Sequence, residues 1–200
     1  MKVGFIGNGN VAKKLGSLME STNYQVSYGT RGDDKNEKSI SEIIKDNEVI
    51  LLAIPYGAVE SVIKNYGELL NGKTVIDITN PINIENWKPI FMGESSAGEK
   101  LSDLLPNSHI VKAFNSIFAD VMDRNKLEFN GQKLTAFIAS DNEQSANLVK
   151  KIADDIGFQG FIVGGIQNAR YLESLANLNI AIALSGGGTE AGFAYHQREA

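Results

Sequence analysis

The sequence predicts an α/β fold, a doubly wound and mostly parallel sheet with a short C-terminal α/β extension. Short apolar runs alternate along the chain with amphipathic stretches of helical period, which is the order that crossover connections between parallel strands produce. The run at 48–53 is almost continuously apolar, as in a strand buried on both faces. The 200 residues, of which 42% are hydrophobic, suit one compact domain with a sizeable core.

The predicted elements follow one another from the N-terminus. Strands are expected at about 2–6, 24–29, 48–53, 74–78, 109–114, 134–140 and 158–163. One helix is expected to end near residue 19, and others at 39–45, 56–66, 97–105, 143–156 and 169–184. Pro55 separates the third strand from the helix that follows it, because proline ends a strand pattern. The alternation of strands and helices indicates a parallel sheet.

The first strand leads directly into Gly7-x-Gly9-x-x-Ala12, the strand, turn and helix of a Rossmann-type dinucleotide-binding unit. Gly7 permits the tight turn, Gly9 lets the backbone approach a pyrophosphate, and Ala12 lets the helix pack closely on the strand. The N–H groups at the start of the helix would face the phosphates. A purely structural glycine turn is the alternative. We expect the pyrophosphate to lie against a turn that consists of Gly7, Asn8, Gly9, Asn10, Val11 and Ala12.

The end of the second strand indicates which dinucleotide binds. An NAD site usually has Asp or Glu there to accept hydrogen bonds from the ribose 2′-hydroxyl, whereas this chain has Gly29-Thr30-Arg31. The Arg31 guanidinium can pair with a 2′-phosphate and the Thr30 hydroxyl can donate to it, with Lys35 as a third candidate. Alternatively, Arg31 is a solvated loop charge. We predict NADP rather than NAD as the cofactor.

The loops after the next strands are further candidates, because ligands collect at the carboxyl ends of parallel strands. Ala53, Ile54 and Pro55 follow the third strand, where they would flank the cofactor ribose. Asn80 follows the fourth strand and either binds ribose or carboxamide or forms an Asx-turn within its own loop. Ala113 and Asn115 end the fifth strand, where a nicotinamide ring and its carboxamide are expected.

Composition narrows the function. The net charge of −5 and the lack of a basic cluster argue against a nucleic-acid partner. The chain has no cysteine, which excludes disulfides, thiol catalysis and cysteine metal sites, and we expect no metal site. No apolar stretch approaches the ~18 residues that a membrane helix requires, and no signal peptide precedes the first strand, so we expect a cytoplasmic protein with no membrane partner.

Several segments together resemble a known family, namely Gly4–Ala12, Gly29–Arg31, Thr79–Pro81, Glu94–Leu101, Leu105–Pro106, Val111–Asn115 and Asn168–Ala176. They resemble the NADP oxidoreductases named for the deazaflavin coenzyme, factor 420, and the NADPH domain of six-transmembrane metalloreductases is similar in the same stretches. The resemblance therefore spans nearly the whole chain, and it implies one NADP-binding domain over 1–200 whose acceptor side is formed by about 141–200.

The resemblance implies hydride transfer between NADPH and a planar small-molecule acceptor, such as a deazaflavin or a flavin as co-substrate. Such a reaction depends mainly on proximity and orientation, so we expect no catalytic acid or base. His109 lies at the strand end opposite the ligands, and His196 lies near the C-terminus. Lys112 is interpreted as a pairing or snorkelling lysine within its strand.

Alternative functions remain open at the level of the sequence. The chain could be a non-catalytic NADPH-sensing module, or an NADPH-dependent flavin or ferric reductase. Pyrroline-carboxylate reductases share the glycine motif but carry a further helical domain. The helix at 169–184 and the segment Gly186–Thr189 could line the acceptor cleft or form the contact of a homodimer. Glu94–Ala97 could present a helix N-terminus to the acceptor, or Ser96 and Glu99 could simply cap that helix.

Overall fold

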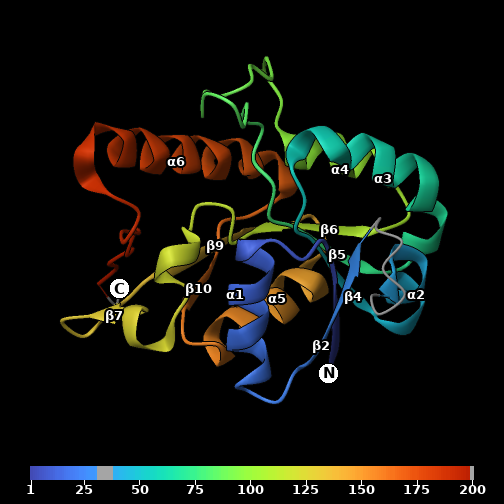
Figure 1. The fold of residues 1–200 in the computed structure, drawn as a ribbon, viewed down its shortest axis with the longest axis horizontal. Helices are drawn as coiled ribbons and strands as arrows, with labels where there is room; N and C mark the ends of the chain where they lie inside the picture. The colour runs from blue at the N-terminus through green and yellow to red at the C-terminus, as the bar shows by residue number, and fades with distance from the viewer. Residues whose placement is uncertain (31–37, 199–200) are drawn as a thin grey trace.

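A computed structural model describes residues 1–30 and 38–198. Its main sheet has eight strands in the order β10-β9-β6-β5-β4-β1-β2-β3, with helices on both faces (Figure 1). The strands are β1 Lys2–Ile6, β2 Gln25–Thr30, β3 Lys38–Ser39, β4 Val49–Leu52, β5 Thr74–Asp77, β6 His109–Ala113, β9 Thr135–Ala139 and β10 Gln159–Ile162. The helices are α1 Asn10–Glu20, α2 Ile40–Asp46, α3 Val59–Tyr66, α4 Ala97–Leu104, α5 Glu143–Asp155 and α6 Ala169–Ile182. The predicted α/β fold with a doubly wound, mostly parallel sheet is confirmed.

The sheet changes direction beyond β6. Strands β1 to β6 are parallel to their neighbours, whereas β9 pairs with β6 in antiparallel fashion and carries β10 parallel to itself. The reversal fits the connection between β6 and β9, which contains no crossover helix but two 3₁₀ turns and the hairpin of β7 Glu128–Phe129 with β8 Gln132–Lys133. The sequence did not predict β3, β7 or β8, since each is only two residues long.

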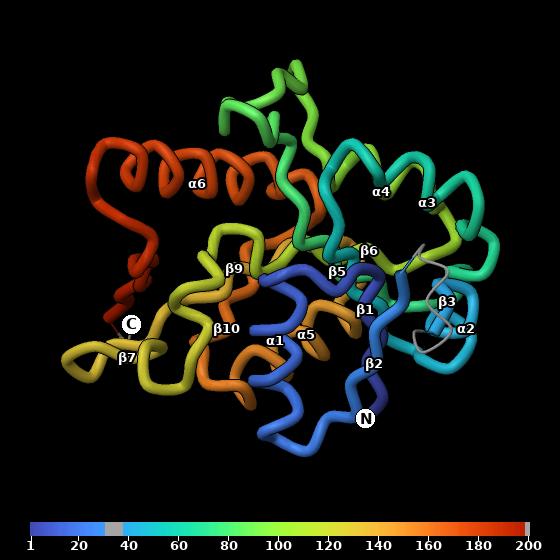
Figure 2. The backbone as a smooth tube through the Cα atoms, in the orientation of Figure 1, coloured from blue at the N-terminus to red at the C-terminus, as the bar shows by residue number. Residues whose placement is uncertain are grey.

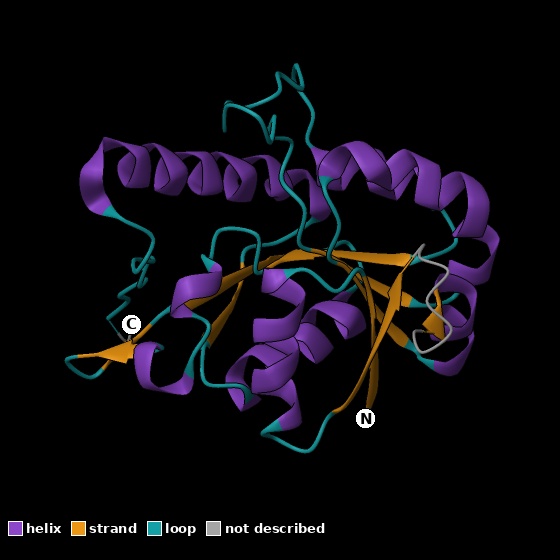
Figure 3. Ribbon diagram, viewed as in Figure 1, coloured by secondary structure: helices purple, strands orange, loops and turns teal. Residues whose placement is uncertain are grey.

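Two hydrophobic cores lie on opposite faces of the sheet (Figure 3). On one face α1 and α5 pack on the sheet, with Leu15 and Val149 fully buried. On the other face α2, α3 and α4 cover it, with Ile43 and Val62 among the buried residues, and α6 begins beside α4. Both faces of β4 are therefore covered, which explains its continuously apolar sequence.

The chain returns to the sheet after α6. Gly186 and Gly188 take positive φ values of 99° and 72°, which glycine adopts without strain, and they redirect the chain at the helix end. The tube trace shows the segment after α6 running back towards β7 (Figure 2). There the amide of Thr135 donates to the carbonyl of Phe193 at 2.8 Å. Across the described ranges, no helix is both long enough and apolar enough to cross a bilayer.

Candidate functional site

The turn between β1 and α1 contains the two motif glycines, which have different structural roles. Gly7 has a φ of +107°, and a Cβ at that position would stand 2.2 Å from the carbonyl oxygen of Ala53. Gly9 has an extended backbone with a φ of −67°, and a Cβ there would have no neighbour within 4 Å among the described residues. Gly7 is thus required by the fold itself. Gly9 instead keeps a space beside the helix N-terminus open.

The N-terminus of α1 faces that open space. Gly9 is the N-cap residue, and as a glycine it provides no side-chain cap of its own to this end of the helix. The first turn carries no acidic residue, so the positive end of the helix dipole is not neutralised locally. An anion could bind the first N–H groups here, as at other helix N-termini. Ala12 is fully buried against the sheet, which lets the helix approach closely.

Thr30 is the last residue of β2 and pairs in register with Ser39 of β3. Arg31 and Lys35, which the sequence assigns to a 2′-phosphate, lie outside the described residues. The geometry of this part of the predicted site therefore rests on Thr30 alone. Its place at the carboxyl end of β2 is the expected one for contact with the adenosine ribose.

Two hollows adjoin at the carboxyl ends of β1, β4, β5 and β6. The first, called here the turn hollow, has a volume of about 350 Å³. Most of the predicted cofactor residues line it, namely Gly9, Asn10, Val11, Ala12, Ala53, Ile54, Pro55 and Asn80. The second, the aromatic hollow, has a volume of about 370 Å³ and is lined by Trp87, Phe114 and Phe118 among others. The hollows share Asn10, Val11, Ile78, Asn80, Ile82 and Trp87, so they form one continuous cleft.

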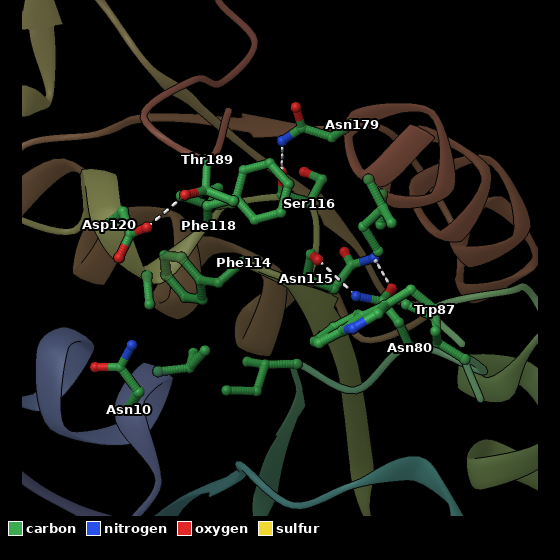
Figure 4. A pocket seen from close by; sticks show the side chains of 17 residues that line it. Asn10, Asn80, Trp87, Phe114, Asn115, Ser116, Phe118, Asp120, Asn179 and Thr189 are labelled. Atoms are coloured by element: carbon green, nitrogen blue, oxygen red, sulfur yellow. Dashed lines mark hydrogen bonds between the residues drawn. The ribbon is translucent and has the colours of Figure 1, made fainter. Parts of the chain in front are cut away.

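Asn80 and Asn115 are joined side by side at the floor of the aromatic hollow (Figure 4). Asn80 Nδ2 donates to the backbone carbonyl of Asn115 at 2.7 Å, and Asn115 Nδ2 donates back to Asn80 Oδ1 at 2.8 Å. Asn115 Nδ2 also donates to the carbonyl of Leu172 on α6 at 3.1 Å. A backbone carbonyl can only accept, so this contact fixes which way the Asn115 amide points. The pairing joins the ends of β5 and β6 to α6.

The amide of Asn115 leaves one acceptor unused. Asn115 is 7% exposed, and its Oδ1 is buried without a hydrogen-bond partner among the residues that the structure describes. A buried polar atom without a partner costs about 1–3 kcal/mol. A ligand N–H group that reached this oxygen would remove that cost, after a small shift of the side chains that cover it.

Phe114 marks a sharp change of backbone direction at the end of β6. Its φ is +59°, a left-handed value that is uncommon for a residue with a Cβ. Ala113 before it is fully buried and lines neither hollow, whereas Phe114 and Asn115 line the aromatic hollow. The predicted role of Ala113 is therefore limited to its backbone. Strained residues of this kind cluster at functional sites, where surrounding structure holds them in place.

The far wall of the aromatic hollow comes from the C-terminal part of the chain. Asn179 of α6 donates through Nδ2 to the carbonyl of Ser116 at 3.0 Å, and the Thr189 hydroxyl donates to Asp120 (Figure 4). Ala176 and Ile180 line the same wall. The sequence suggested that the helix containing Asn179 and the segment ending at Thr189 could wall the acceptor cleft, but it gave no sign of Trp87 or Asp120 as lining residues. No local pattern identifies them, because each reaches the cleft only through long-range packing.

Lys112, Asp77 and Glu173 form a buried charged cluster, of which the sequence indicated only that Lys112 pairs or snorkels. Lys112 Nζ lies 2.8 Å from Asp77 Oδ2 and 3.0 Å from Glu173 Oε1, with side-chain exposures of 0%, 1% and 5%. Lys112 is thus a pairing lysine, and it does not snorkel to solvent. Burial lowers the pKa of Lys112, but the charges and hydrogen bonds of the two carboxylates outweigh burial and raise it above its ordinary value.

The N-terminus of α4 has its own partner. Ser96 caps the helix, since its hydroxyl accepts from the amide of Glu99 at 3.1 Å, as the capping alternative predicted. The amides of Ala97 and Gly98 donate to the two carboxylate oxygens of Glu173, at 3.0 and 3.1 Å. These N–H groups therefore face Glu173 and not the cleft. The other alternative, a helix end presented to the acceptor, does not fit this arrangement.

The remaining titratable candidates lie away from the cleft. His109 is exposed at the start of β6, at the opposite end of the strand from Phe114, and His196 is exposed near the C-terminus. Within residues 1–30 and 38–198, no group of three or more His, Asp or Glu side chains could hold a metal ion. The chemistry of the cleft thus rests on amides, hydroxyls, aromatic rings and backbone groups, with Asp120 as the one carboxylate among the residues that line the aromatic hollow.

Comparison with known proteins identifies relatives of the chain. Residues 2–81 match the family described as "NADP oxidoreductase coenzyme F420-dependent". An F420-dependent NADP reductase of Methanothermobacter marburgensis is 30% identical over 152 residues, which cover 70% of this chain and 66% of that protein. Human metalloreductase STEAP2 is 30% identical over 186 residues, covering 86% of this chain but 35% of that protein. The resemblance predicted from the sequence is confirmed, although the chain spans only part of these relatives.

A solved structure of an Arthrobacter sp. FB24 protein matches the fold closely. Its TM-score is 0.88 at 20% sequence identity, and the match covers 98% of this chain and 100% of that one. At this identity the likeness concerns the fold alone. It extends from β1 through α6, so the antiparallel β9 and β10 belong to the shared architecture.

Proposed function

We propose, from the membership of residues 2–81 in the family of coenzyme F420-dependent NADP oxidoreductases, that this chain is an NADP(H)-dependent oxidoreductase. It would transfer a hydride between NADPH and a planar acceptor such as a deazaflavin or a flavin. The observation that carries the proposal is the continuous cleft, which runs from the N-terminus of α1 to an aromatic hollow at the end of β6. An extended dinucleotide requires a phosphate-binding end and an apolar end of this kind.

The chain offers suitable contacts for each part of NADPH. The pyrophosphate would lie beside Gly9, where a Cβ would meet no atom of the described residues within 4 Å and the first N–H groups of α1 begin. The adenosine 2′-phosphate would contact Thr30 and the following Arg31, which the sequence supplies at the end of β2. Ile54 and Pro55 would pack against the central part of the cofactor. Gly9, Ile54 and Pro55 thus line the turn hollow, and Thr30 and Arg31 would extend the site beyond it at the end of β2.

The nicotinamide would lie over the Asn80–Asn115 pair. Its carboxamide carries N–H donors, and Asn115 Oδ1 is a buried acceptor that lacks a donor among the described residues. The bound cofactor supplies the hydride, while Phe114, Phe118 and Trp87 form apolar walls that can hold a flat acceptor and exclude water. Orientation and proximity of this kind can supply a large share of the rate enhancement without a general acid or base.

The acceptor is tested by anaerobic oxidation of NADPH, followed at the nicotinamide absorbance. Turnover with an oxidised deazaflavin would support the reductase of that type. Turnover only with free flavin and ferric iron would identify a metalloreductase-like activity, in line with the sequence similarity to STEAP2. NADPH binding without turnover of either acceptor would contradict the proposal and favour the sensing module.

We also propose that the protein forms a homodimer through α6. The outward side of this helix exposes Tyr171, Leu178 and Ile182, at 65%, 51% and 43% of their surface, and Leu184 follows at 66%. Large apolar side chains gathered on one helix face are typical of protein contacts. Since α6 also supplies a wall of the aromatic hollow, a second copy there would hold that wall in place.

A further inference from the structure

The buried cluster of Lys112, Asp77 and Glu173 is the feature that the proposed reaction does not use. It joins three elements, because Lys112 is on β6, Asp77 ends β5 and Glu173 is on α6. The two carboxylates and one ammonium carry a net charge of −1 if all are ionised. Each oxygen contact on the carboxylates comes from an N–H donor, and all four carboxylate oxygens have such a partner.

Stability alone is a weak reason for such a cluster. Removing charges from water is expensive, and replacing a buried ion triad by uncharged residues of similar volume is often neutral or stabilising. The contacts of the cluster suggest a more specific role. Asp77 Oδ1 accepts the backbone N–H of Thr79 at 2.9 Å, and Lys112 Nζ donates to the backbone carbonyl of Thr79 at 2.6 Å. Both polar groups of the Thr79 backbone are therefore held by the buried ion pair.

Thr79 is directly followed by Asn80, so the cluster fixes the backbone that carries the cleft amide. Asn80 and Asn115 are joined by hydrogen bonds, and the Asn115 side chain also donates a hydrogen bond to the carbonyl of Leu172. Leu172 precedes Glu173, and the Glu173 carboxylate forms an ion pair with Lys112. The interactions thus form a closed ring through the ends of β5 and β6 and the first half of α6. A displacement of any member moves the amide pair at the floor of the aromatic hollow.

The ring is anchored on the side away from the cleft. Glu173 accepts the amides of Ala97 and Gly98, so the N-terminus of α4 holds its carboxylate in a fixed orientation. Gly98 allows the close approach, because a Cβ there would lie 2.7 Å from the Cβ of Ala169. The cluster also lies near the cleft wall. Burial, and next the negative charges of Glu173 and Asp77, raise the pKa of Tyr56, which lines the turn hollow.

We propose that Lys112, Asp77 and Glu173 are positioning residues, which hold Asn80 and Asn115 in the orientation that receives the nicotinamide end of the cofactor. The inference rests on the proposed function, since it assigns a role at the same cleft. None of the three side chains touches the reacting atoms. They act through the backbone of Thr79 and through α6.

The test compares two ligands that share the adenosine end of the cofactor. NADP⁺ reaches the amide pair, whereas 2′,5′-ADP ends at the phosphates and does not. The principal variant combines Lys112→Met, Asp77→Asn and Glu173→Gln, which removes all three charges and so avoids an unpaired buried ion. The matched control is Lys73→Met, because Lys73 donates to the carbonyl of Asn47 at 2.8 Å just before the opposite end of β5.

A positioning role predicts a change in the ratio of the two affinities. The triple variant should bind NADP⁺ about 10-fold more weakly, the loss of about one hydrogen bond, and bind 2′,5′-ADP within about twofold of wild type. Hydride transfer to any acceptor used by the wild type should fall about 100-fold, as expected for a small misplacement of reacting groups. Lys73→Met should leave the ratio unchanged.

Other outcomes overturn the inference. A folded triple variant that binds both ligands as wild type does would show that the cluster positions nothing, and an equal loss for both would indicate a general structural role. If the triple variant does not fold, the single variant Asp77→Asn decides by the same ratio, because it keeps the Lys112–Glu173 contact. A wild-type protein that binds neither ligand would refute the proposed function itself, whereas an unchanged ratio would leave that function intact.

Discussion

The substitution Gly9→Ala separates the needs of the fold from those of the cofactor. A Cβ at Gly9 meets no atom within 4 Å in the part of the chain that the structure describes, and the φ of −67° suits alanine. Alanine is a poorer N-cap than glycine, but it also restricts the unfolded chain. Each effect is at most about 1 kcal/mol and the two oppose each other. For a chain of this length the melting temperature should therefore shift by less than about 4 °C.

Binding of NADPH should suffer far more than stability. The added methyl group would stand in the open space where the pyrophosphate is proposed to approach the first N–H groups of α1. Hydrogen bonds to a charged partner contribute about 1.5–3 kcal/mol each, so the loss of one of them weakens binding about 10- to 100-fold. Fluorescence titration with NADPH and thermal unfolding by circular dichroism measure the two effects on the same samples.

Gly7→Ala serves as the comparison. Its Cβ would overlap a backbone carbonyl at 2.2 Å, and the φ of +107° adds strain of about 1–3 kcal/mol. This variant should lose stability whether or not a cofactor binds. The reasoning is refuted if Gly9→Ala binds NADPH as tightly as wild type, or if Gly9→Ala and Gly7→Ala are destabilised to the same extent.

Three further substitutions test other parts of the structure. Arg31→Ala should reduce the preference for NADPH over NADH, measured as the ratio of their affinities, and an unchanged preference would contradict the 2′-phosphate assignment. Burial raises the pKa of Glu99, but hydrogen bonds from Arg170 and Ser96 outweigh it and hold that pKa below the ordinary value of 4.5. The stability that this carboxylate contributes is thus present above about pH 4.5 and is lost as the pH falls through the lower pKa of the folded state. The difference in unfolding free energy between wild type and Glu99→Gln should therefore shrink between pH 7 and pH 3. It should be less than about 1 kcal/mol, because the Glu99–Arg170 pair is partly exposed. Leu178→Glu should convert the proposed dimer to a monomer in light scattering, and an unaltered mass would exclude this face of α6 as the contact.

The parts of the site that the sequence predicts are those built from neighbouring residues. The turn from Gly7 to Ala12 is contiguous, so strand, turn and helix can be derived from one motif. The strand ends at Ala53 and Asn80 follow from apolar runs that stop at a proline-containing turn. Eight of the predicted cofactor residues line the turn hollow for this reason.

Long-range contacts determine the remaining parts of the fold and of the site, and no local sequence pattern predicts such contacts. The direction of β9 depends on the connection that precedes it, since the apolar period of a strand is the same in either orientation. Lys112 is visible as an oddity within an apolar strand, but one of its partners, Glu173, is on a helix whose charged residues look solvated in the sequence. Trp87 is in an irregular segment between β5 and α4, and only the folded chain places it over both hollows.

Because one end of the cleft is built from neighbouring residues and the other from long-range contacts, the cofactor and acceptor ends can change independently. The cofactor end depends on one short segment, in which Gly7 is fixed by the fold and Gly9 by the space beside it. The acceptor end is assembled from 114–120, α6 and Thr189, all of which lie far along the chain from the turn between β1 and α1. The buried ring through Lys112 and Glu173 holds Asn80, which lines both hollows. Replacements on the lining face of α6 should therefore alter acceptor choice while NADPH affinity is kept, provided that Glu173 still holds α6 against Lys112.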